Sequence, residues 1–262
     1  MDSKSTPNLS ILIITLNEEN QMEALLADLD FADEIIVVDS FSTDKTETIC
    51  KSFKKVQFIQ NKFENYSSQR NFAINQGKND WILFLDADER LTLGLKNEII
   101  NTIKTNDSYS AFFFYRTFMF KYKELHFSGN QNDKIFRLFN KNQAHYIKER
   151  LVHEKLEVRG KIGVLENKLI HYSYTNYQAY KSKTIRYGKL KAEEKFLKKQ
   201  NPSVLLHLLH PTYNFLFNYI IRLGILDGKK GLIICYLNAY SIHIRYQELG
   251  RLWKRKLLFP PK

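Results

Sequence analysis

The chain has few cysteines and none of the glycine-rich loops that bind nucleotides in many α/β proteins. Its 262 residues include two cysteines, Cys50 and Cys235, which lie far apart and form no Cys-x-x-Cys pair. This usage indicates a reducing compartment and argues against a structural zinc site. No Gly-x-Gly-x-x-Gly or Walker-type loop follows any expected strand, so the usual dinucleotide and P-loop fingerprints are absent.

The sequence also lacks internal repeats, low-complexity linkers and a clear targeting segment. Residues 1–8 are polar and the apolar run that follows is short, so we expect no signal peptide. The apolar stretch 204–226 contains polar residues that are costly inside a bilayer. These residues are His207, His210, Pro211, Asn214, Asn218 and Arg222. We therefore expect an interfacial helix or hairpin here; the alternative is an ordinary helical layer packed on the sheet.

Basic residues are the minority among the charged residues of the first 108 positions, and acidic residues are few in the rest of the chain. Residues 1–108 carry 11 Lys and Arg against 18 Asp and Glu, a balance of −7. The other 154 residues carry 29 against 10, a balance of +19. This asymmetry indicates that the second half meets a polyanion or an anionic surface. Nucleic acid and a phospholipid surface both qualify on composition alone.

The first hundred residues alternate between strands and short helices. The apolar runs predict strands at 9–15, 34–39, 56–59 and 81–85, and the segments between and after them predict helices at 21–29, 46–54, 66–76 and 92–104. Strands that are nearly continuous in apolar character are typical of a parallel sheet with both faces covered. The predicted class is α/β, a mostly parallel, Rossmann-like sheet flanked by helices.

The remainder of the chain predicts an antiparallel extension followed by helices. Aromatic, partly alternating segments predict strands at 111–120, 134–140 and 169–172, and helices are expected at 180–200, 204–226 and 232–258. We predict a catalytic domain over 1–175, with a nucleotide-binding half 1–108 and an acceptor half 109–175. Residues 176–262 are predicted to form a basic, amphipathic helical region.

Polar side chains cluster where the predicted parallel strands end. The buried strand 81–85 runs into Asp86, Asp88 and Glu89; Asn17 and Glu18 follow the first strand, and Asp39 and Ser40 close the second. A buried strand that ends in like charges needs a cation, and Mg²⁺ or Mn²⁺ suits oxygen ligands. We expect a site for a metal-complexed nucleotide at this rim. Alternatively, Asp88 or Glu89 caps the next helix.

These motifs resemble glycosyltransferase family 2, which has the GT-A fold and uses nucleotide-diphosphate sugars. The segments that carry the resemblance are ILIITLNEE at 11–19, IVVDSFSTDKT at 36–46, QRNFA at 69–73 and LDADE at 85–89. The later segments IFRLFN at 135–140, VHE at 152–154, IHYS at 170–173 and LDGK at 226–229 are similar to the bacterial lipopolysaccharide-core β-1,4-glucosyltransferase group. The resemblance therefore covers nearly the whole chain.

The resemblance implies a role for each residue at the donor site. Asp39 would accept a hydrogen bond from the uracil ring, with other donor-site residues around it. These are Thr15, Asn17, Glu18 and Ser40. Asp86 would face the ribose and the metal, and Asp88 would bind Mg²⁺ or Mn²⁺ between the two phosphates. Arg70 would face the donor phosphate; the alternative is a surface helix residue.

The implied chemistry is transfer with inversion, which requires a base for the acceptor hydroxyl. Glu154 is the predicted base, since flanking apolar residues could raise its pKa, and Asp133 is the alternative. The alternative for Glu154 is a pair with a nearby Lys or Arg on an exposed strand. His171 could complete the metal shell, although a single histidine beside tyrosines is often structural.

The sequence thus predicts an inverting, metal-dependent enzyme that moves glucose or a related hexose, from a donor that is UDP-linked. The expected acceptor is a lipopolysaccharide-core or other lipid-linked envelope glycan, and the expected location is cytoplasmic, peripheral on the inner face of the cytoplasmic membrane. One alternative keeps the fold but uses polyprenyl phosphate as acceptor, yet its Arg-Gln-rich signature is missing. A basic nucleic-acid-binding protein is the other alternative. The lack of a recognisable RNA- or DNA-binding motif argues against it.

Overall fold

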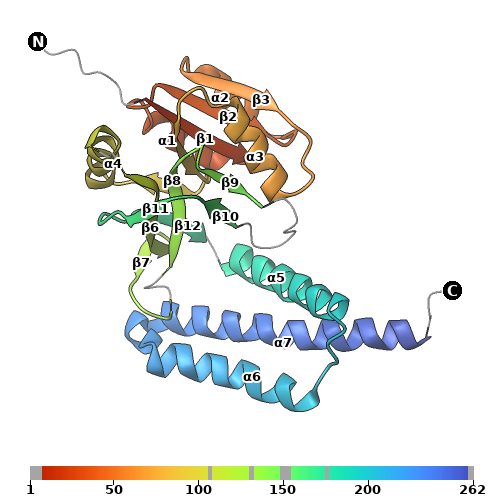
Figure 1. Ribbon diagram of the computed structural model, residues 1–262. Coiled ribbons are helices and arrows are strands. Elements are labelled where there is room, and N and C mark those ends of the chain that lie inside the picture. The colour runs from red at the N-terminus through yellow and green to blue at the C-terminus, as the bar shows by residue number, and fades with distance from the viewer. Residues whose placement is uncertain (1–7, 106–107, 130–132, 148–154, 175–176, 259–262) are drawn as a thin grey trace, which may run out of the picture. The chain divides into compact units, whose positions relative to one another are not determined.

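The computed structural model describes residues 8–105, 108–129, 133–147, 155–174 and 177–258 (Figure 1). The chain divides into two compact units, the first made of residues 1–116 and 134–171, the second of 117–133 and 172–262. A division into compact units does not assign activity, so the catalytic domain expected over 1–175 stays a prediction.

The first unit is built on four parallel strands. They lie in the order β3-β2-β1-β4, with bounds Leu9–Thr15 (β1), Glu34–Asp39 (β2), Val56–Gln60 (β3) and Trp81–Leu85 (β4). The helices of this unit are α1 (Glu19–Ala27), α2 (Thr46–Ser52), α3 (Tyr66–Gln76) and α4 (Leu93–Thr105). Parallel neighbours need crossover connections, and α1 to α3 supply them.

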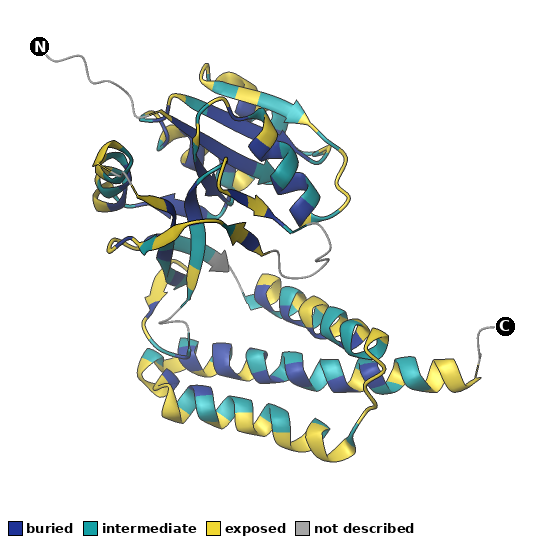
Figure 2. Cartoon of the chain, in the orientation of Figure 1, coloured by how far each residue is buried: buried dark blue, intermediate teal, exposed yellow. Residues whose placement is uncertain are grey.

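Both faces of this sheet are buried, as the apolar runs predict. Ile11 and Ile13 of β1 pack in one hydrophobic cluster with residues of α1, while Leu12, which points to the opposite face, packs in a second cluster with residues of α3. Figure 2 shows β1, β2 and β4 as almost entirely buried. Alternation across a strand explains why three consecutive apolar residues serve two separate clusters.

An antiparallel extension continues the sheet beyond β4. There β8 (Lys134–Asn140) pairs antiparallel with β4 and with β6 (Tyr109–Phe120), and β12 (Leu169–Tyr174) pairs antiparallel with β5 (Glu89–Leu91). The shorter strands are β7 (Lys123–Leu125), β9 (Ala144–Tyr146), β10 (Leu156–Val158) and β11 (Lys161–Val164). The predicted fold class, an α/β sheet with an antiparallel extension and a helical C-terminal region, is confirmed.

The second unit is mainly helical. Its elements after β12 are α5 (Tyr177–Leu197), α6 (Val204–Leu216), a π-helical turn η1 (Phe217–Ile221), a 3₁₀ turn η2 (Gly224–Asp227) and α7 (Gly228–Leu258). Gly188 lets α5 approach α7 closely, because a Cβ there would lie 2.7 Å from the Ser241 carbonyl oxygen. No helix in the described part of the chain is both long and apolar enough to cross a bilayer.

Candidate active site

The loops after β1 and β2 are tied together by the polar residues that the sequence places at the donor site. Asp39, fully buried, accepts hydrogen bonds from the backbone N–H of Ser42 at 2.8 Å and from the Ser42 hydroxyl. Asn17 adopts a left-handed φ of 56°, which asparagine tolerates well, and its Oδ1 accepts from the Thr43 N–H at 2.8 Å. The Asn17 N–H donates to Ser42 Oγ at 2.8 Å.

The other predicted donor-site residues flank this pair of loops. The Ser40 N–H donates to the Thr15 carbonyl at 2.9 Å, and Ser40 Oγ accepts from Gln69 Nε2 at 3.1 Å. The Glu18 N–H donates to Thr46 Oγ1 at 2.9 Å, at the start of α2. Thr15 Oγ1 is buried and has no hydrogen-bond partner among the described residues. A buried hydroxyl normally has a partner, so this atom is consistent with an absent ligand group.

Two arginines hold the carboxylate of Asp86. Arg70 Nη2 donates to Asp86 Oδ1 at 2.8 Å, and Arg137 Nη2 donates to Asp86 Oδ2. Partial burial would raise the pKa of Asp86, but the charges of Arg137 and Arg70 outweigh it and lower that pKa well below its usual range. Asp86 is therefore ionised and fixed in orientation. Arg70 itself is buried and lies over the Phe84 ring, so it is not a surface helix residue.

Glu89 shares Arg137 with Asp86. Arg137 Nη2 donates to Glu89 Oε1 at 2.7 Å, and Arg116 Nη1 lies 3.5 Å from the same oxygen. Glu89 Oε2 accepts from the Asp86 N–H at 3.0 Å, which closes the turn that contains Asp88. Since Glu89 and Arg137 are fully buried, their charges must be paired, and the network pairs them.

A β-bulge directs Arg137 into this network. On β8, Leu138 pairs with Phe112 of β6 and Phe136 pairs with Phe113, so Arg137 is the extra residue between two consecutive pairs. A bulge at such a point re-aims one side chain relative to the regular alternation. Burial lowers the pKa of a guanidinium, but Asp86 and Glu89 more than offset this and raise the pKa of Arg137 above its ordinary value.

Asp88 faces a histidine from a distant part of the chain. His171 on β12 pairs with Glu89 on β5, one residue after Asp88, and this register brings His171 Nε2 to 3.3 Å from Asp88 Oδ2. The Asp88 side chain is 27% exposed and that of His171 is 12% exposed, so both are accessible from solvent. The structure therefore brings together two of the residues expected to bind metal.

The residues present fit a divalent ion that a diphosphate completes. Two ligands about 2.1 Å from an octahedral ion, in adjacent positions, would lie about 3.0 Å apart, close to the separation of Asp88 and His171. No cluster of three or more His, Cys, Asp or Glu in the described residues is arranged as a metal site. Mg²⁺ and Mn²⁺ commonly take one or two protein ligands and complete their shell with substrate phosphates and water. An imidazole ligand favours a transition metal such as Mn²⁺ over Mg²⁺.

Some predicted residues lie elsewhere or outside the described structure. Glu154, the expected base, is outside the described residues. Asp133 is half-buried and directly precedes β8. A cavity of about 580 Å³ is lined by residues of α3, β9 and β10, and another of about 790 Å³ by α6 and α7; no predicted donor-site residue lines either one.

Sequence reasoning missed part of the network that fixes the acidic turn. Arg137 received no role, Glu89 was considered only as one of the acidic residues after the strand or as a helix cap, and Arg116 was not singled out. A signal was present, since Arg137 stands alone among apolar residues in the strand 134–140 and a buried arginine requires acidic partners. The bulge that aims it could not be read from the sequence, because the apolar pattern is the same with and without it.

The chain is similar in sequence to known proteins. The sequence model of glycosyl transferase family 2 matches residues 10–156. An uncharacterized glycosyltransferase of Rickettsia bellii is 29% identical over 263 residues, covering 96% of this chain and 89% of its own. The lipopolysaccharide core biosynthesis glycosyltransferase LpsC of Rhizobium meliloti is 25% identical over 256 residues, covering 93% and 94%. Among solved structures, S. aureus TarS 1–349 in complex with UDP is 16% identical, with a TM-score of 0.47 and coverage of 94% and 91%.

Proposed function

Since the chain belongs to glycosyl transferase family 2, we propose that it moves glucose or a related hexose from a UDP-sugar to a lipopolysaccharide-core or other envelope glycan. That the chain is a glycosyltransferase follows from its family; the donor, the acceptor and the residue roles are proposed. The observation that carries the proposal is the Asp88–His171 pair at 3.3 Å, beside an Asp86 that two arginines hold.

The donor is proposed to lie along the ends of β1, β2 and β4. Asp39 accepts from the N–H of the uracil ring, and the Asn17 and Ser40 loops line the nucleoside. Thr15 Oγ1, which is buried without a partner among the described residues, would donate to the nucleotide. Asp86, oriented by Arg70 and Arg137, faces the ribose.

Asp88 and His171 are proposed to hold a divalent ion, Mn²⁺ in preference to Mg²⁺. When bound, this ion neutralises the charge that develops on the departing nucleoside diphosphate. The protein's own contribution is to fix Asp88 in the turn before β5 and His171 on the antiparallel neighbour β12, so that little reorganisation is needed when the donor enters. Glu154, or alternatively Asp133, takes the proton of the acceptor hydroxyl, and attack opposite the leaving group inverts the anomeric centre.

The acceptor is proposed to be bound to a membrane, with the enzyme peripheral on the inner face of the cytoplasmic membrane. A relative that covers nearly the whole chain is named for lipopolysaccharide core biosynthesis. The positive balance of +19 in the residues after 108 also suits an anionic surface.

A donor-hydrolysis screen tests the proposal. Wild-type protein is incubated with UDP-, GDP- and dTDP-sugars, with Mn²⁺ or with EDTA, and released nucleotide is measured. We expect Mn²⁺-dependent turnover of a UDP-sugar that Asp88→Ala abolishes and the exposed control Asp30→Ala retains. Full metal-dependent turnover by Asp88→Ala would contradict the assignment.

A second variant tests the proposed base. Glu154→Gln removes the proton acceptor but keeps the size of the side chain, so donor binding should persist while transfer to the acceptor is lost. Loss of UDP affinity in this variant would instead place Glu154 at the donor site, and full transfer activity would point to Asp133.

A further inference from the structure

Helix α6 presents its polar residues to α7. His207 Nε2 lies 3.0 Å from His243 Nδ1, and His210 Nδ1 lies 3.1 Å from the Tyr246 hydroxyl. Asn218, in the η1 turn that continues α6, is 7% exposed and donates to the Asn214 carbonyl at 2.8 Å. Three of the polar residues that make 204–226 unsuitable for a bilayer, His207, His210 and Asn218, are therefore on the inner side of the helix, whereas Arg222 is exposed.

The outer side of the same helix is apolar. Its residues recur at helical spacing, at intervals of one, three and four positions, and form one stripe along α6 and η1, which we call the α6 apolar face. They are Val204 (80% exposed), Leu205 (64%), Leu208 (66%), Leu209 (56%), Tyr213 (63%), Leu216 (46%) and Ile220 (54%). The 18 residues from 204 to 221 carry no Asp, Glu, Lys or Arg. Figure 2 shows α6 mostly in the colours of exposed and intermediate residues.

A helix at a water-facing surface normally exposes its polar residues and buries its apolar ones, whereas α6 exposes most of its apolar residues. Burial of apolar surface is the main favourable term in folding, so a contiguous exposed apolar stripe marks a surface that another apolar phase covers. The 18 residues of the face extend about 27 Å, a little less than the roughly 30 Å of a bilayer's hydrocarbon core, and no helix in the described residues is long and apolar enough to cross a bilayer. A helix of this kind lies in the membrane interface instead of crossing it.

Charge identifies the covering phase. Residues 172–262 contain 17 Lys and Arg against 4 Asp and Glu, a balance of +13. Lys198 and Lys199 precede the α6 apolar face and Arg222 follows it, so both ends are basic. A second copy of the chain would bring two such positive surfaces together, whereas an anionic phospholipid surface complements them.

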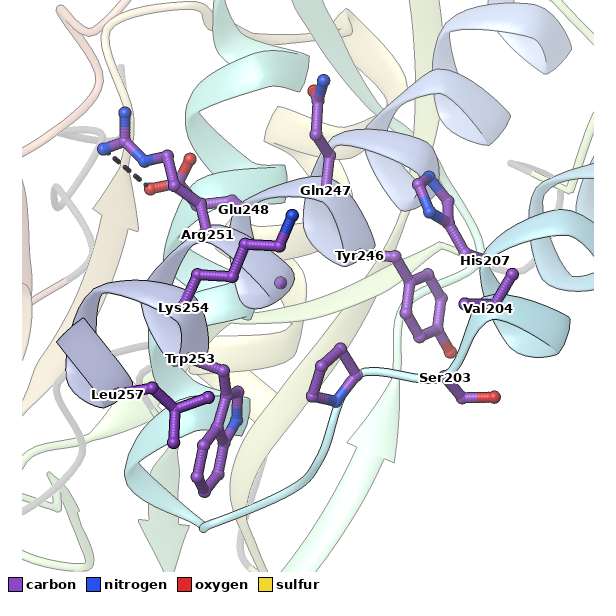
Figure 3. Close-up of a pocket in the computed structure, with 12 residues that line it drawn as sticks. Ser203, Val204, His207, Tyr246, Gln247, Glu248, Arg251, Trp253, Lys254 and Leu257 are labelled. Carbon is purple, nitrogen blue, oxygen red and sulfur yellow. Dashed lines mark ion pairs between the residues drawn. The ribbon is translucent and has the colours of Figure 1, made fainter.

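A groove adjoins the N-terminal end of the α6 apolar face. It has a volume of about 790 Å³ and lies between the start of α6 and the end of α7, with Val204 belonging to both the groove and the face. Trp253 and Leu257 lie at one end of the groove, and His207 and Val204 at the other (Figure 3). Arg251, Lys254 and Glu248 also line it, and Glu248 pairs with Arg251 at 3.2 Å, so the groove combines an interfacial indole with one unit of net positive charge.

We propose that the α6 apolar face docks into an anionic phospholipid monolayer and that the groove at Trp253 receives a lipid headgroup phosphate through Arg251 and Lys254. This inference adds a membrane-binding surface to the proposed function. It rests on that function in one respect, namely that the enzyme must reach a membrane-bound acceptor. The docking itself is independent of sugar transfer.

Vesicle co-sedimentation tests the docking surface. We expect wild-type protein to bind vesicles of equimolar phosphatidylglycerol and phosphatidylcholine, and to bind neutral phosphatidylcholine vesicles far less. The variant Leu205→Glu/Leu209→Glu should lower the partition coefficient about tenfold or more, because two exposed side chains lose their apolar contact. The control Leu93→Glu/Val164→Glu alters residues 74% and 51% exposed in the first unit and should leave binding unchanged.

The basic groove has its own test. Arg251→Gln/Lys254→Gln should lower vesicle affinity at low salt by several-fold and flatten its salt dependence, while Lys54→Gln/Lys62→Gln in the first unit should not. In a Trp81→Phe background Trp253 is the remaining tryptophan, and its fluorescence should shift to the blue on anionic vesicles and be quenched by brominated lipid. Unquenched Trp253 would remove the groove from the contact.

Several outcomes overturn the inference. These are equal binding to neutral and anionic vesicles, full vesicle binding by Leu205→Glu/Leu209→Glu, and a wild-type dimer that the same variant dissociates. Circular dichroism melting establishes that every variant is folded, and donor hydrolysis without vesicles does so for the variants of the docking surface and the groove. Asp88→Ala should lose hydrolysis yet bind vesicles as the wild type does, so that failure of the docking surface and failure of the proposed reaction are told apart.

Discussion

At the scale of single residues, Arg137 is the common partner of the two buried or partly buried carboxylates that shape the acidic turn. Replacing it with methionine keeps the approximate volume but leaves Glu89 fully buried with a weaker ion pair to Arg116. We expect Arg137→Met to lower the free energy of unfolding by about 3–5 kcal/mol, measured by urea denaturation. The exposed Arg159→Met is the control and should change it by less than about 0.5 kcal/mol. Equal stability of the two variants would contradict the network.

Asp86 gives a pH-dependent prediction. Because the pKa of Asp86 is lower in the folded chain than in the unfolded one, its stabilising effect is complete above about pH 4 and declines as the pH falls further. The stability difference between the wild type and Asp86→Asn should therefore shrink steadily from pH 4 downward. A difference that stayed constant over this range would mean that Arg70 and Arg137 do not lower the pKa of Asp86.

The sequence identified residues whose signal is local and missed those whose role depends on the fold. Asp39 stands at the end of β2, and Asp86 and Asp88 follow β4; both strands pair with β1, one on each side of it. Arg137 lies far along the chain and reaches the turn only through a bulge on β8. His171 was proposed as a ligand, but its contact with Asp88 depends on the β5–β12 register, which no local pattern specifies.

At the scale of elements, the buried strands were the most predictable part. The bounds 9–15, 34–39 and 81–85 agree with β1, β2 and β4, because each apolar run ends abruptly in polar residues. The stretch 204–226 was expected as a single helix or hairpin. In the structure it divides into α6, η1 and η2, with Leu223 in the left-handed region at a φ of 56°. Hydropathy is continuous across the junction of α6 and η1 and gives no sign of it, whereas Arg222 does mark the break between η1 and η2.

Gly188 and Gly250 offer a matched test of helix packing in the second unit. A methyl group at Gly188 would lie 2.7 Å from the Ser241 carbonyl oxygen, whereas nothing lies within 4 Å of one at Gly250. We expect Gly188→Ala to destabilise the chain by about 1–3 kcal/mol through forced separation of α5 and α7. Gly250→Ala should be neutral or stabilise by up to about 1 kcal/mol, since alanine favours a helix. Thermal unfolding of both variants measures these stability changes. Stabilisation by Gly188→Ala would exclude a close contact between α5 and α7.

At the scale of the whole molecule, the sequence predicted a division of charge between the two halves. It could not predict that His207 and His210 face α7 while most leucines of α6 are exposed, because the partners of the two histidines lie 36 residues further along the chain. The acidic strand ends and the basic helices thus form two separate chemical surfaces, one proposed for the donor and one for the membrane.

Calorimetric titration of UDP in the presence and absence of Mn²⁺ tests the central claim most directly. The account predicts that wild-type protein binds UDP tightly with Mn²⁺ and weakly with EDTA, and that Asp88→Asn and His171→Ala each lose the gain due to the metal, while Asp30→Asn keeps it. Mn²⁺-dependent UDP binding of wild-type strength by Asp88→Asn would contradict the account, because Asp88 would then not hold the ion that binds the diphosphate.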